Sequence, residues 1–467
     1  MTDESPPDAP RRRAVLATLA GGLGVSLAGC SSGPSSPTPS ATPRPTDPST
    51  DSPTDDGTPT GTDVPVERLR TLGASVYHLY AVGAFEDARR YYADRFDADL
   101  DTEELRGGWD AWTATAGRFE GVAGTVHRTQ EGFDVVKVVG AFQTGLVAID
   151  FVFGGNADVV GLFHSNPNTG EYAPPGYAAS EAVVESGVAL SEASCGLPAV
   201  LTTPSDSGSG TVPGVVLVGD DGPRDRNGAV GPNRPLQDLA WGLADRGVAS
   251  LRYDSRALSC DSLAPEATTL DALVEDATVA VERLRSLDGV GPVAVLGHGL
   301  GGWIAPRVAA AATVDGVAVL AAPGRPLTTT RPEAAQRVAE VDGTVEDTEQ
   351  RWVDHVTSEA DRVGDLAADE TALGATGAFW ASVADYDPVA ETSGLSVPTH
   401  LLFGGRDFEV PEADRQRWTE AGAVQVVDAA NHLLQTGEGP ATPGEYAIPN
   451  TVAEAVVTDV AEFVTGL

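Results

Sequence analysis

The chain has 467 residues, enough for two or three domains, and a hydrophobic fraction of 41%, which suffices for ordinary globular cores. Its 68 acidic and 30 basic residues give a net charge of −38, and Lys137 is the only lysine. Because the sequence contains no basic patch, we predict that the protein does not bind nucleic acid.

The acidic excess has two interpretations. A high net charge keeps proteins soluble, and it is also tolerable in molar salt, where screening acts within a few Å. The scarcity of lysine and the single methionine resemble halophilic archaeal proteins. We therefore favour adaptation to high salt over a merely soluble surface.

Residues 1–30 are expected to be an export signal. Three arginines at 11–13 precede a short apolar stretch at 14–28, which resembles a twin-arginine signal. The stretch ends in Leu-Ala-Gly-Cys, which resembles a lipobox, so Cys30 is expected to carry the lipid that anchors the mature protein to the membrane. The stretch is too short and glycine-rich to predict a membrane span. As a cleaved signal or as an uncleaved anchor, it places the chain at the extracellular face of the cytoplasmic membrane.

Residues 31–63 are almost entirely Ser, Thr, Pro, Asp and Gly, a composition that cannot bury apolar area. We expect a disordered tether that holds the folded part off the membrane. After Cys30 the chain contains only two cysteines, Cys195 and Cys260. An extracellular compartment permits a disulfide between them, but two free buried thiols are equally consistent with the sequence.

Residues 64–170 are predicted to form a small α+β domain, because helical spacing from Val66 and a second helix at 85–96 precede consecutive strands. The four strand-like runs are 121–129, 133–141, 145–153 and 159–163. The segment resembles the small nuclear-transport-factor-like domain of unknown function that precedes certain hydrolases. Tyr80, Trp109 and Trp112 belong either to its core, which we favour, or to a ligand pocket. Its histidines lack the spacing of metal ligands, so we expect no metal and no cofactor.

From residue 181 to 467, apolar runs alternate with helical stretches, which predicts a doubly wound α/β sheet. Six runs are predicted to be buried parallel strands: 214–218, 249–253, 294–296, 317–321, 400–403 and 424–427. Residues 326–384 interrupt the alternation with acidic helical sequence. We expect them to form a helical cap over the carboxyl edge of the sheet, where ligands bind in such folds.

Residues 297–302, Gly-His-Gly-Leu-Gly-Gly, match the nucleophile-elbow pattern G-x-S-x-G except that Gly299 occupies the serine position. Asp407 follows one later strand and His432 follows the next, in the order of nucleophile, acid and histidine that α/β-hydrolases use. Together with segments 231–235 and 253–256, these motifs make the domain resemble the α/β-hydrolase superfamily. The resemblance is to its extracellular esterase-like and peptidase-like members in particular.

The resemblance implies that Asp407 orients His432, which would take the proton of a nucleophile. The alternatives are an ordinary turn aspartate and a histidine with satisfied hydrogen bonds. Gly299 has no side chain with which to attack. Because glycine adopts the strained backbone of an elbow freely, replacing serine with glycine should leave the fold intact.

The loop after residues 214–218 also departs from the family, whose members carry His-Gly where this chain has Gly-Asp-Asp-Gly-Pro at 219–223. The N–H groups of Asp221 and Leu300 are the candidate oxyanion donors. The carboxylates of Asp220 and Asp221 would oppose an oxyanion if they faced it. We expect both carboxylates to point to solvent.

Two hypotheses of function follow. The first is an exported, lipid-anchored pseudo-hydrolase whose cleft binds a small acyl or ester-like ligand, or a partner, without serine catalysis. The second is an active carboxylic-ester or related acyl hydrolase that uses water activated by the histidine, or a displaced nucleophile. Ser255, Ser262 and Cys260 are the candidates for a displaced nucleophile, although nothing in the sequence places them near His432. A third hypothesis, a structural surface module, rests on the tether and charge alone.

Overall fold

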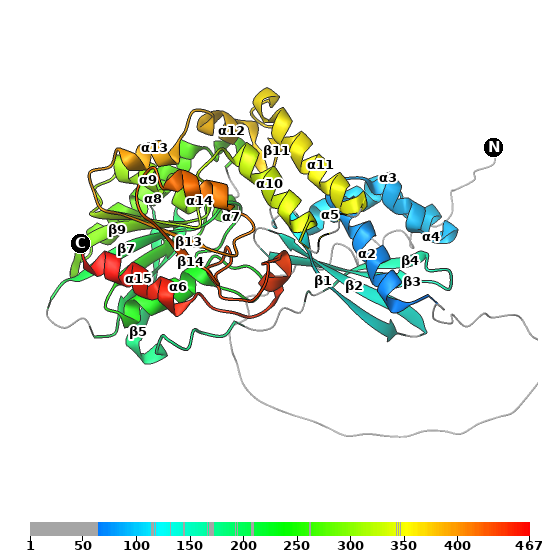
Figure 1. The fold of residues 1–467 in the computed structure, drawn as a ribbon, viewed down its shortest axis with the longest axis horizontal. Helices are drawn as coiled ribbons and strands as arrows, with labels where there is room; N and C mark the ends of the chain where they lie inside the picture. Colours follow the sequence, from blue (N-terminus) through cyan, green and yellow to red (C-terminus); the bar gives the residue numbers. More distant parts are fainter. Residues whose placement is uncertain are drawn as a thin grey trace, which may run out of the picture.

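The computed structural model describes residues 64–467 apart from positions 114–115, 117, 131, 143–144, 166, 168–171, 192, 194, 207–209, 261–262, 342, 344 and 346. The expected signal, the tether and Cys30 lie outside the described residues. Within them the chain forms a small α+β unit, blue to cyan in Figure 1, followed by a larger α/β unit, green to red. No described helix is both long and apolar enough to cross a membrane.

The small unit is a four-stranded antiparallel sheet with helix α2 (Val66–Ala81) packed against it. Leu69, Val76 and Leu79 recur on one face of α2 and are buried against the sheet. The strands pair in sequence order and match the four predicted runs: β1 (Phe119–Gln130), β2 (Phe133–Phe142), β3 (Gly145–Phe153) and β4 (Val159–Ser165).

The prediction of one continuous helix at 85–96 is wrong. The segment is divided into α3 (Phe85–Ala88), the 3₁₀ turn η1 (Arg89–Tyr91) and α4 (Asp94–Asp99), and α5 (Thr102–Thr113) follows. The break occurs because Tyr92 adopts an extended backbone and forms a bridge with Val159 of β4. Pairing with the sheet edge thus overrides the helical periodicity.

The aromatic residues of the small unit lie where the core interpretation places them. Tyr80 and Trp109 are 2% and 8% exposed, and their ring centroids are 5.9 Å apart. Trp112 packs at the margin of the same cluster. These side chains therefore stabilise the small unit through burial of apolar area.

The larger unit contains an eight-stranded sheet of order β14-β13-β10-β9-β7-β8-β6-β5. All six predicted strands are present and pair in parallel: β7 (Val212–Val218), β8 (Ala249–Tyr253), β9 (Val290–His298), β10 (Gly316–Leu320), β13 (Thr399–Gly404) and β14 (Val424–Val427). Their carboxyl ends therefore meet at one edge of the sheet.

The sequence did not predict β5 (Val183–Leu190) and β6 (Leu197–Pro204), which join the sheet in antiparallel pairing. These strands do not form continuous apolar runs, because one side of the hairpin is exposed. The expectation that residues 424–427 are buried is also wrong. They form the opposite edge of the sheet, where Val426 is 40% exposed.

Helices cover both faces of this sheet (Figure 1). α8 (Leu270–Arg285) and α9 (Leu300–Ala311) share one hydrophobic core with the sheet, and α6 (Pro235–Asp245) and α15 (Glu454–Thr465) share the other. The shorter elements are α7 (Arg256–Ser259), α13 (Pro388–Ser393), α14 (Glu412–Trp418) and the 3₁₀ turns η2 (Ser180–Ala182), η3 (Pro265–Ala267) and η5 (Pro443–Ala447).

Residues 326–384 form mainly helices above the sheet edge: α10 (Leu327–Ala339), α11 (Asp347–Arg362), η4 (Val363–Asp365), β11 (Thr371–Ala372), β12 (Ala375–Thr376) and α12 (Gly377–Val383). Figure 1 shows α10 and α11 between the large sheet and the small unit. Trp352 of α11 packs against Ala335 and Ala339 of α10, and its ring centroid lies 5.7 Å from that of Phe119 in β1. The cap thus fixes the start of β1 beside the carboxyl edge of the sheet.

Cys195 and Cys260 form a disulfide with Cα atoms 5.7 Å apart, which resolves the alternative that the sequence left open. The bond joins the turn before β6 to the end of α7, across 65 positions of sequence. A cross-link of this length restricts the unfolded chain much more than the folded one.

Reduction of this disulfide should lower the free energy of unfolding by on the order of 2–4 kcal/mol. The measurement is thermal and urea unfolding in concentrated salt with and without dithiothreitol. A Cys195→Ser/Cys260→Ser variant provides the control, because dithiothreitol should no longer change its midpoint. Equal midpoints for the oxidised and reduced wild type would contradict the stabilising role.

Candidate active site

Gly299 forms a sharp turn between β9 and α9, with φ 55° and ψ −121°. A residue with a side chain would occupy this conformation at a cost of about 1–3 kcal/mol, whereas glycine adopts it freely. Gly301, in the first turn of α9, lies so close to the β7 backbone that a Cβ would overlap the carbonyl oxygen of Val218. The helix therefore begins directly over the sheet, and its first N–H groups face the carboxyl edge.

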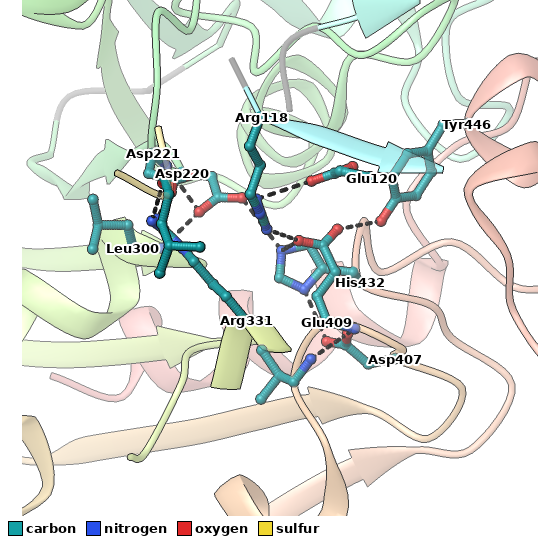
Figure 2. Close-up of polar contacts among 12 residues, drawn as sticks. Arg118, Glu120, Asp220, Asp221, Leu300, Arg331, Asp407, Glu409, His432 and Tyr446 are labelled. Atoms are coloured by element: carbon teal, nitrogen blue, oxygen red, sulfur yellow. Dashed lines mark hydrogen bonds and ion pairs between the residues drawn. The ribbon is translucent and has the colours of Figure 1, made fainter. Parts of the chain in front are cut away.

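Asp407 and His432 are in contact, as the sequence led us to expect. Asp407 follows β13, and its Oδ1 accepts hydrogen bonds from the N–H groups of Glu409 and Val410 at 2.8 and 2.9 Å. Its Oδ2 lies 2.9 Å from Nδ1 of His432, which follows β14 (Figure 2). Both side chains are almost fully buried. The acid and the histidine therefore have the geometry of an oriented imidazole.

The carboxylate of Asp220 occupies the place beside Gly299 where a nucleophile would project. Its Oδ1 accepts hydrogen bonds from the N–H groups of Leu300 and Asp221 at 2.7 and 2.8 Å, and its Oδ2 lies 3.3 Å from His432 Nε2 (Figure 2). A Cβ built on Gly299 would overlap Asp220 Oδ1. The two candidate oxyanion donors thus converge on one oxygen, and that oxygen belongs to the protein.

The expectation that Asp220 and Asp221 point to solvent is wrong for both. The Asp220 side chain is 11% exposed and the Asp221 side chain 13%. Asp221 pairs with Arg331 of α10, whose Nη1 also donates to the carbonyl oxygen of Leu373. The loop turns inward because buried N–H groups and cations compensate the lost hydration of both carboxylates.

Asp220 and His432 hold each other in their charged forms. Burial acts to raise the pKa of Asp220, but its contacts with His432 and with Arg224, whose Nη2 lies 3.5 Å from Oδ2, hold that pKa well below its usual range. Burial acts to lower the pKa of His432, but the negative charges of Asp407 and Glu409 and the hydrogen bond to Asp220 raise it well above its usual value. These contacts favour the imidazolium form of His432, which cannot accept a proton.

The small unit supplies one wall of the site. Arg118, just before β1, donates to Glu409 Oε2 at 3.0 Å and to Glu120 Oε1 at 3.2 Å (Figure 2). The hydroxyl of Tyr446 donates to the other oxygen of Glu409 at 2.5 Å. Burial, together with the charge of Glu409, raises the pKa of Glu120 to about 8. Sequence motifs gave no signal for this cluster, because its members come from separate units of the chain.

The two described candidates for a displaced nucleophile, Ser255 and Cys260, have other partners than the histidine. The hydroxyl of Ser255 donates to the carbonyl oxygen of Gly222 and accepts from the N–H of Arg224, both at 3.0 Å. Cys260 is in the disulfide. Ser262 lies outside the described residues. The side chain that contacts His432 Nε2 is instead that of Asp220, which the sequence did not suggest as a nucleophile.

Two cavities meet at Asp220. The larger, about 470 Å³, is lined by β7, β8, α8, α9 and the cap. The smaller, about 30 Å³, is lined by residues including Arg118, Gly299, Glu409 and His432. The two cavities share Asp220, Asp221, Leu300 and Arg331. The larger volume is in the range of small-molecule binding sites.

Asp220, His298 and His432 place potential metal-ligand atoms within 4.8 Å of one another. Both ring nitrogens of His432 already face carboxylates, and His298 Nε2 donates to the carbonyl oxygen of His432 at 2.7 Å. The guanidinium of Arg224 beside Asp220 also opposes a second cation there. These contacts indicate that the three side chains belong to a hydrogen-bonded network and not to a metal site.

Comparisons with known proteins agree with the fold. Residues 227–442 match the alpha/beta hydrolase family, and residues 74–162 match a family of unknown function, DUF3887. The chain is 30% identical over 386 residues to the esterase EstD of Thermotoga maritima, an alignment that covers 81% of this chain and 91% of that protein. The chain therefore belongs to the α/β-hydrolase family and is esterase-like in sequence.

Solved structures with similarity to the chain include two esterases. Est1E from Butyrivibrio proteoclasticus is 16% identical with a TM-score of 0.40, covering 60% of this chain and 98% of that one. Brefeldin A esterase, a bacterial homologue of human hormone-sensitive lipase, is 18% identical with a TM-score of 0.39, covering 64% of this chain and 81% of that one.

We expect the free energy of unfolding to depend on pH through His432. Folding raises its pKa above the ordinary value of 6.5, so its stabilising contribution is complete below that pH. The contribution decreases as the pH rises and is lost above the raised folded pKa. Urea unfolding of wild type and His432→Gln, from mildly acidic to alkaline pH, should show a stability difference that narrows with rising pH.

His355→Gln on α11 is the matched control, because it removes a histidine far from this network. The pH profile of its stability should parallel that of the wild type. A stability difference between wild type and His432→Gln that stays constant with pH would contradict the cationic state of His432.

Proposed function

We propose that this protein is an exported, lipid-anchored esterase-like member of the α/β-hydrolase family that has lost serine-based ester hydrolysis. Its cleft still receives a small ester-like or acyl ligand. The observation that carries the proposal is the position of the Asp220 carboxylate, which fills the space beside Gly299 and accepts the Leu300 N–H.

With the carboxylate in this position, two requirements of ester hydrolysis through an acyl-enzyme are not met. A nucleophile must attack from the elbow, and Gly299 has none. A tetrahedral intermediate needs the N–H groups of Asp221 and Leu300 for its oxyanion, and the Asp220 carboxylate already accepts both of them. A fixed negative charge at that point also repels an incoming oxyanion.

The alternative function is hydrolysis by activated water or by a displaced nucleophile. Direct attack on an ester by water requires a neutral His432 and free oxyanion donors, and the contacts of Asp220 oppose both conditions. The displaced-nucleophile version is supported by one specific observation, which is that Asp220 itself stands between the donor N–H groups and His432.

Export and lipid anchoring rest on the arginine-led apolar stretch and on the Leu-Ala-Gly-Cys sequence that ends at Cys30. The Cys195–Cys260 disulfide supports placement outside the cytoplasm, because such bonds persist in oxidising compartments. The acidic composition supports function at high salt.

Gly299→Ser alone should give no activity toward 4-nitrophenyl butyrate and no labelling by a fluorophosphonate, because the new side chain overlaps the Asp220 carboxylate. The double variant Asp220→Gly/Gly299→Ser removes the overlap, frees the Leu300 N–H and supplies the nucleophile. We expect it to be labelled and to exceed the ester turnover of the wild type by about 100-fold or more.

Asp220→Gly alone is the matched control, since it frees the donors without supplying a serine and should remain unlabelled. All assays are made in concentrated salt. Fluorophosphonate labelling of the wild type, or ester turnover by the wild type that disappears in His432→Ala, would contradict the loss of serine-type ester hydrolysis.

Cys30→Ser should move the protein from the membrane fraction to the medium when it is expressed in a halophilic archaeal host, because the thioether-linked lipid is lost. Ser35→Ala, in the tether, is the control and should leave the protein in the membrane fraction. The measurement is immunoblotting of both fractions. Wild-type protein found entirely in the medium would contradict the anchor.

A further inference from the structure

We propose that Asp220 is itself a nucleophile, and that the protein hydrolyses neutral, largely apolar molecules whose sp³ carbon carries a group that leaves as an anion. The intermediate is an alkyl ester of Asp220. The inference rests on the proposed function in one respect, namely that the site does not use serine chemistry on esters, and it assigns the same site a different reaction.

The first observation is that the two oxygens of Asp220 have different surroundings. Oδ1 accepts hydrogen bonds from the N–H groups of Leu300 and Asp221, whereas Oδ2 lies 3.3 Å from His432 Nε2 and 3.5 Å from Arg224 Nη2. Oδ1 is thus fixed by short hydrogen bonds, whereas the contacts of Oδ2 with His432 and Arg224 are longer. A carboxylate held in this way presents one oxygen for attack.

The second observation is that the oxyanion donors point at the carboxylate. Attack on a substrate carbonyl would develop negative charge on the substrate, away from these donors. Attack on an sp³ carbon needs no oxyanion donor. Hydrolysis of the resulting ester at Asp220 Cγ develops the negative charge on Oδ1, to which the Leu300 and Asp221 N–H groups already donate. The geometry therefore favours an alkyl electrophile over an acyl one.

In the first step, Asp220 Oδ2 forms a bond to the substrate carbon while the bond from that carbon to the leaving group breaks. The electron pair departs with the leaving group, which enters the larger cavity as an anion. The guanidinium groups of Arg224 and Arg331 line that cavity. No proton and no external oxidant or reductant is needed.

In the second step, His432 first releases its proton to solvent. A water molecule then gives a proton to the neutral imidazole and adds its oxygen to Cγ of Asp220. The tetrahedral intermediate then expels the alkoxide, which takes the proton from His432 and leaves as an alcohol. The carboxylic acid of Asp220 then gives its proton to His432, which restores the carboxylate and the imidazolium of the starting state. The overall reaction converts the substrate and water into an alcohol, the leaving anion and a proton.

Alkylation itself prepares His432 for this role. The esterified Asp220 has no negative charge, so one of the contacts that keeps the imidazole protonated is lost and its proton is released more readily. The cavity of about 30 Å³, lined by Gly299, Asp220 and His432, has room for one water molecule beside Cγ. A side chain at position 299 would reduce that room.

The larger cavity indicates the class of substrate. Two of its arginines form ion pairs, Arg331 with Asp221 and Arg256 with Asp276, the latter through contacts of 2.7 and 2.8 Å. Much of the remaining lining is apolar, including Tyr253, Leu258, Leu263, Leu273, Ile304 and Phe379. Such a cavity favours a neutral, apolar molecule over an ionic one.

The test uses 1-bromobutane as the probe, with the intact protein in concentrated salt and bromide release measured by ion chromatography. Wild type should release bromide over many turnovers. Asp220→Asn keeps the hydrogen bonds of Oδ1 but loses the nucleophilic anion, and should reduce release by about 100-fold or more. Asp288→Asn, which removes an exposed charge far from the site, is the matched control and should retain wild-type turnover.

His432→Gln separates the two steps. It should release at most one equivalent of bromide and then stop, with the mass of one butyl group on the peptide that contains Asp220. In a single turnover of the wild type in H₂¹⁸O, the heavy isotope should appear in Asp220, and the butanol should carry the original carboxylate oxygen.

Three results would overturn the inference. They are full turnover by Asp220→Asn, heavy oxygen entering butanol directly, and absence of both bromide release and butylation of Asp220. The ester assay distinguishes this failure from failure of the proposed function. If the wild type is inactive on both 1-bromobutane and 4-nitrophenyl butyrate, only the alkyl-enzyme is refuted. If the wild type shows ester turnover that a fluorophosphonate inhibits, the proposed function is refuted.

Discussion

The hydrogen bonds of the Asp220 carboxylate join three separate segments of the α/β unit, and the arrangement of the site depends on them. One oxygen accepts from the start of α9, and the other lies beside His432. The contact is possible only because Gly299 has no side chain, since the two positions compete for one volume. The same contact adds to the negative charges of Asp407 and Glu409 in raising the pKa of His432, so Asp220 contributes to both the steric and the electrostatic properties of the site.

The features of the fold and site that follow from hydrophobic periodicity and motif order could be predicted from the sequence. The parallel strands, the cap and the contact of Asp407 with His432 are present, because a doubly wound sheet brings its loops to one edge. The directions of loop side chains were not predictable. Asp220 was expected to face solvent, as most of the 68 acidic residues of the chain must, and nothing local in the sequence reveals the N–H groups to which its carboxylate is hydrogen-bonded.

The cluster of Arg118 and Glu409 shows a second limit of sequence reasoning. These residues are separated by 291 positions and belong to different units, so no motif joins them. Their contact depends on how the small unit packs against α10 and α11. Residues 74–162, which match a family of unknown function, therefore belong to a unit that lies beside the hydrolase-like site in this chain.

The shared volume at Gly299 and Asp220 also constrains the order in which such a site can arise. Starting from an elbow with serine and a small residue at position 220, an aspartate introduced first would collide with the serine side chain and disrupt the turn. Loss of the serine first leaves a vacant volume that a later aspartate can fill, with hydrogen-bond donors already in place. The two positions are therefore sterically coupled, because the Asp220 carboxylate in this place requires a residue without a side chain at position 299.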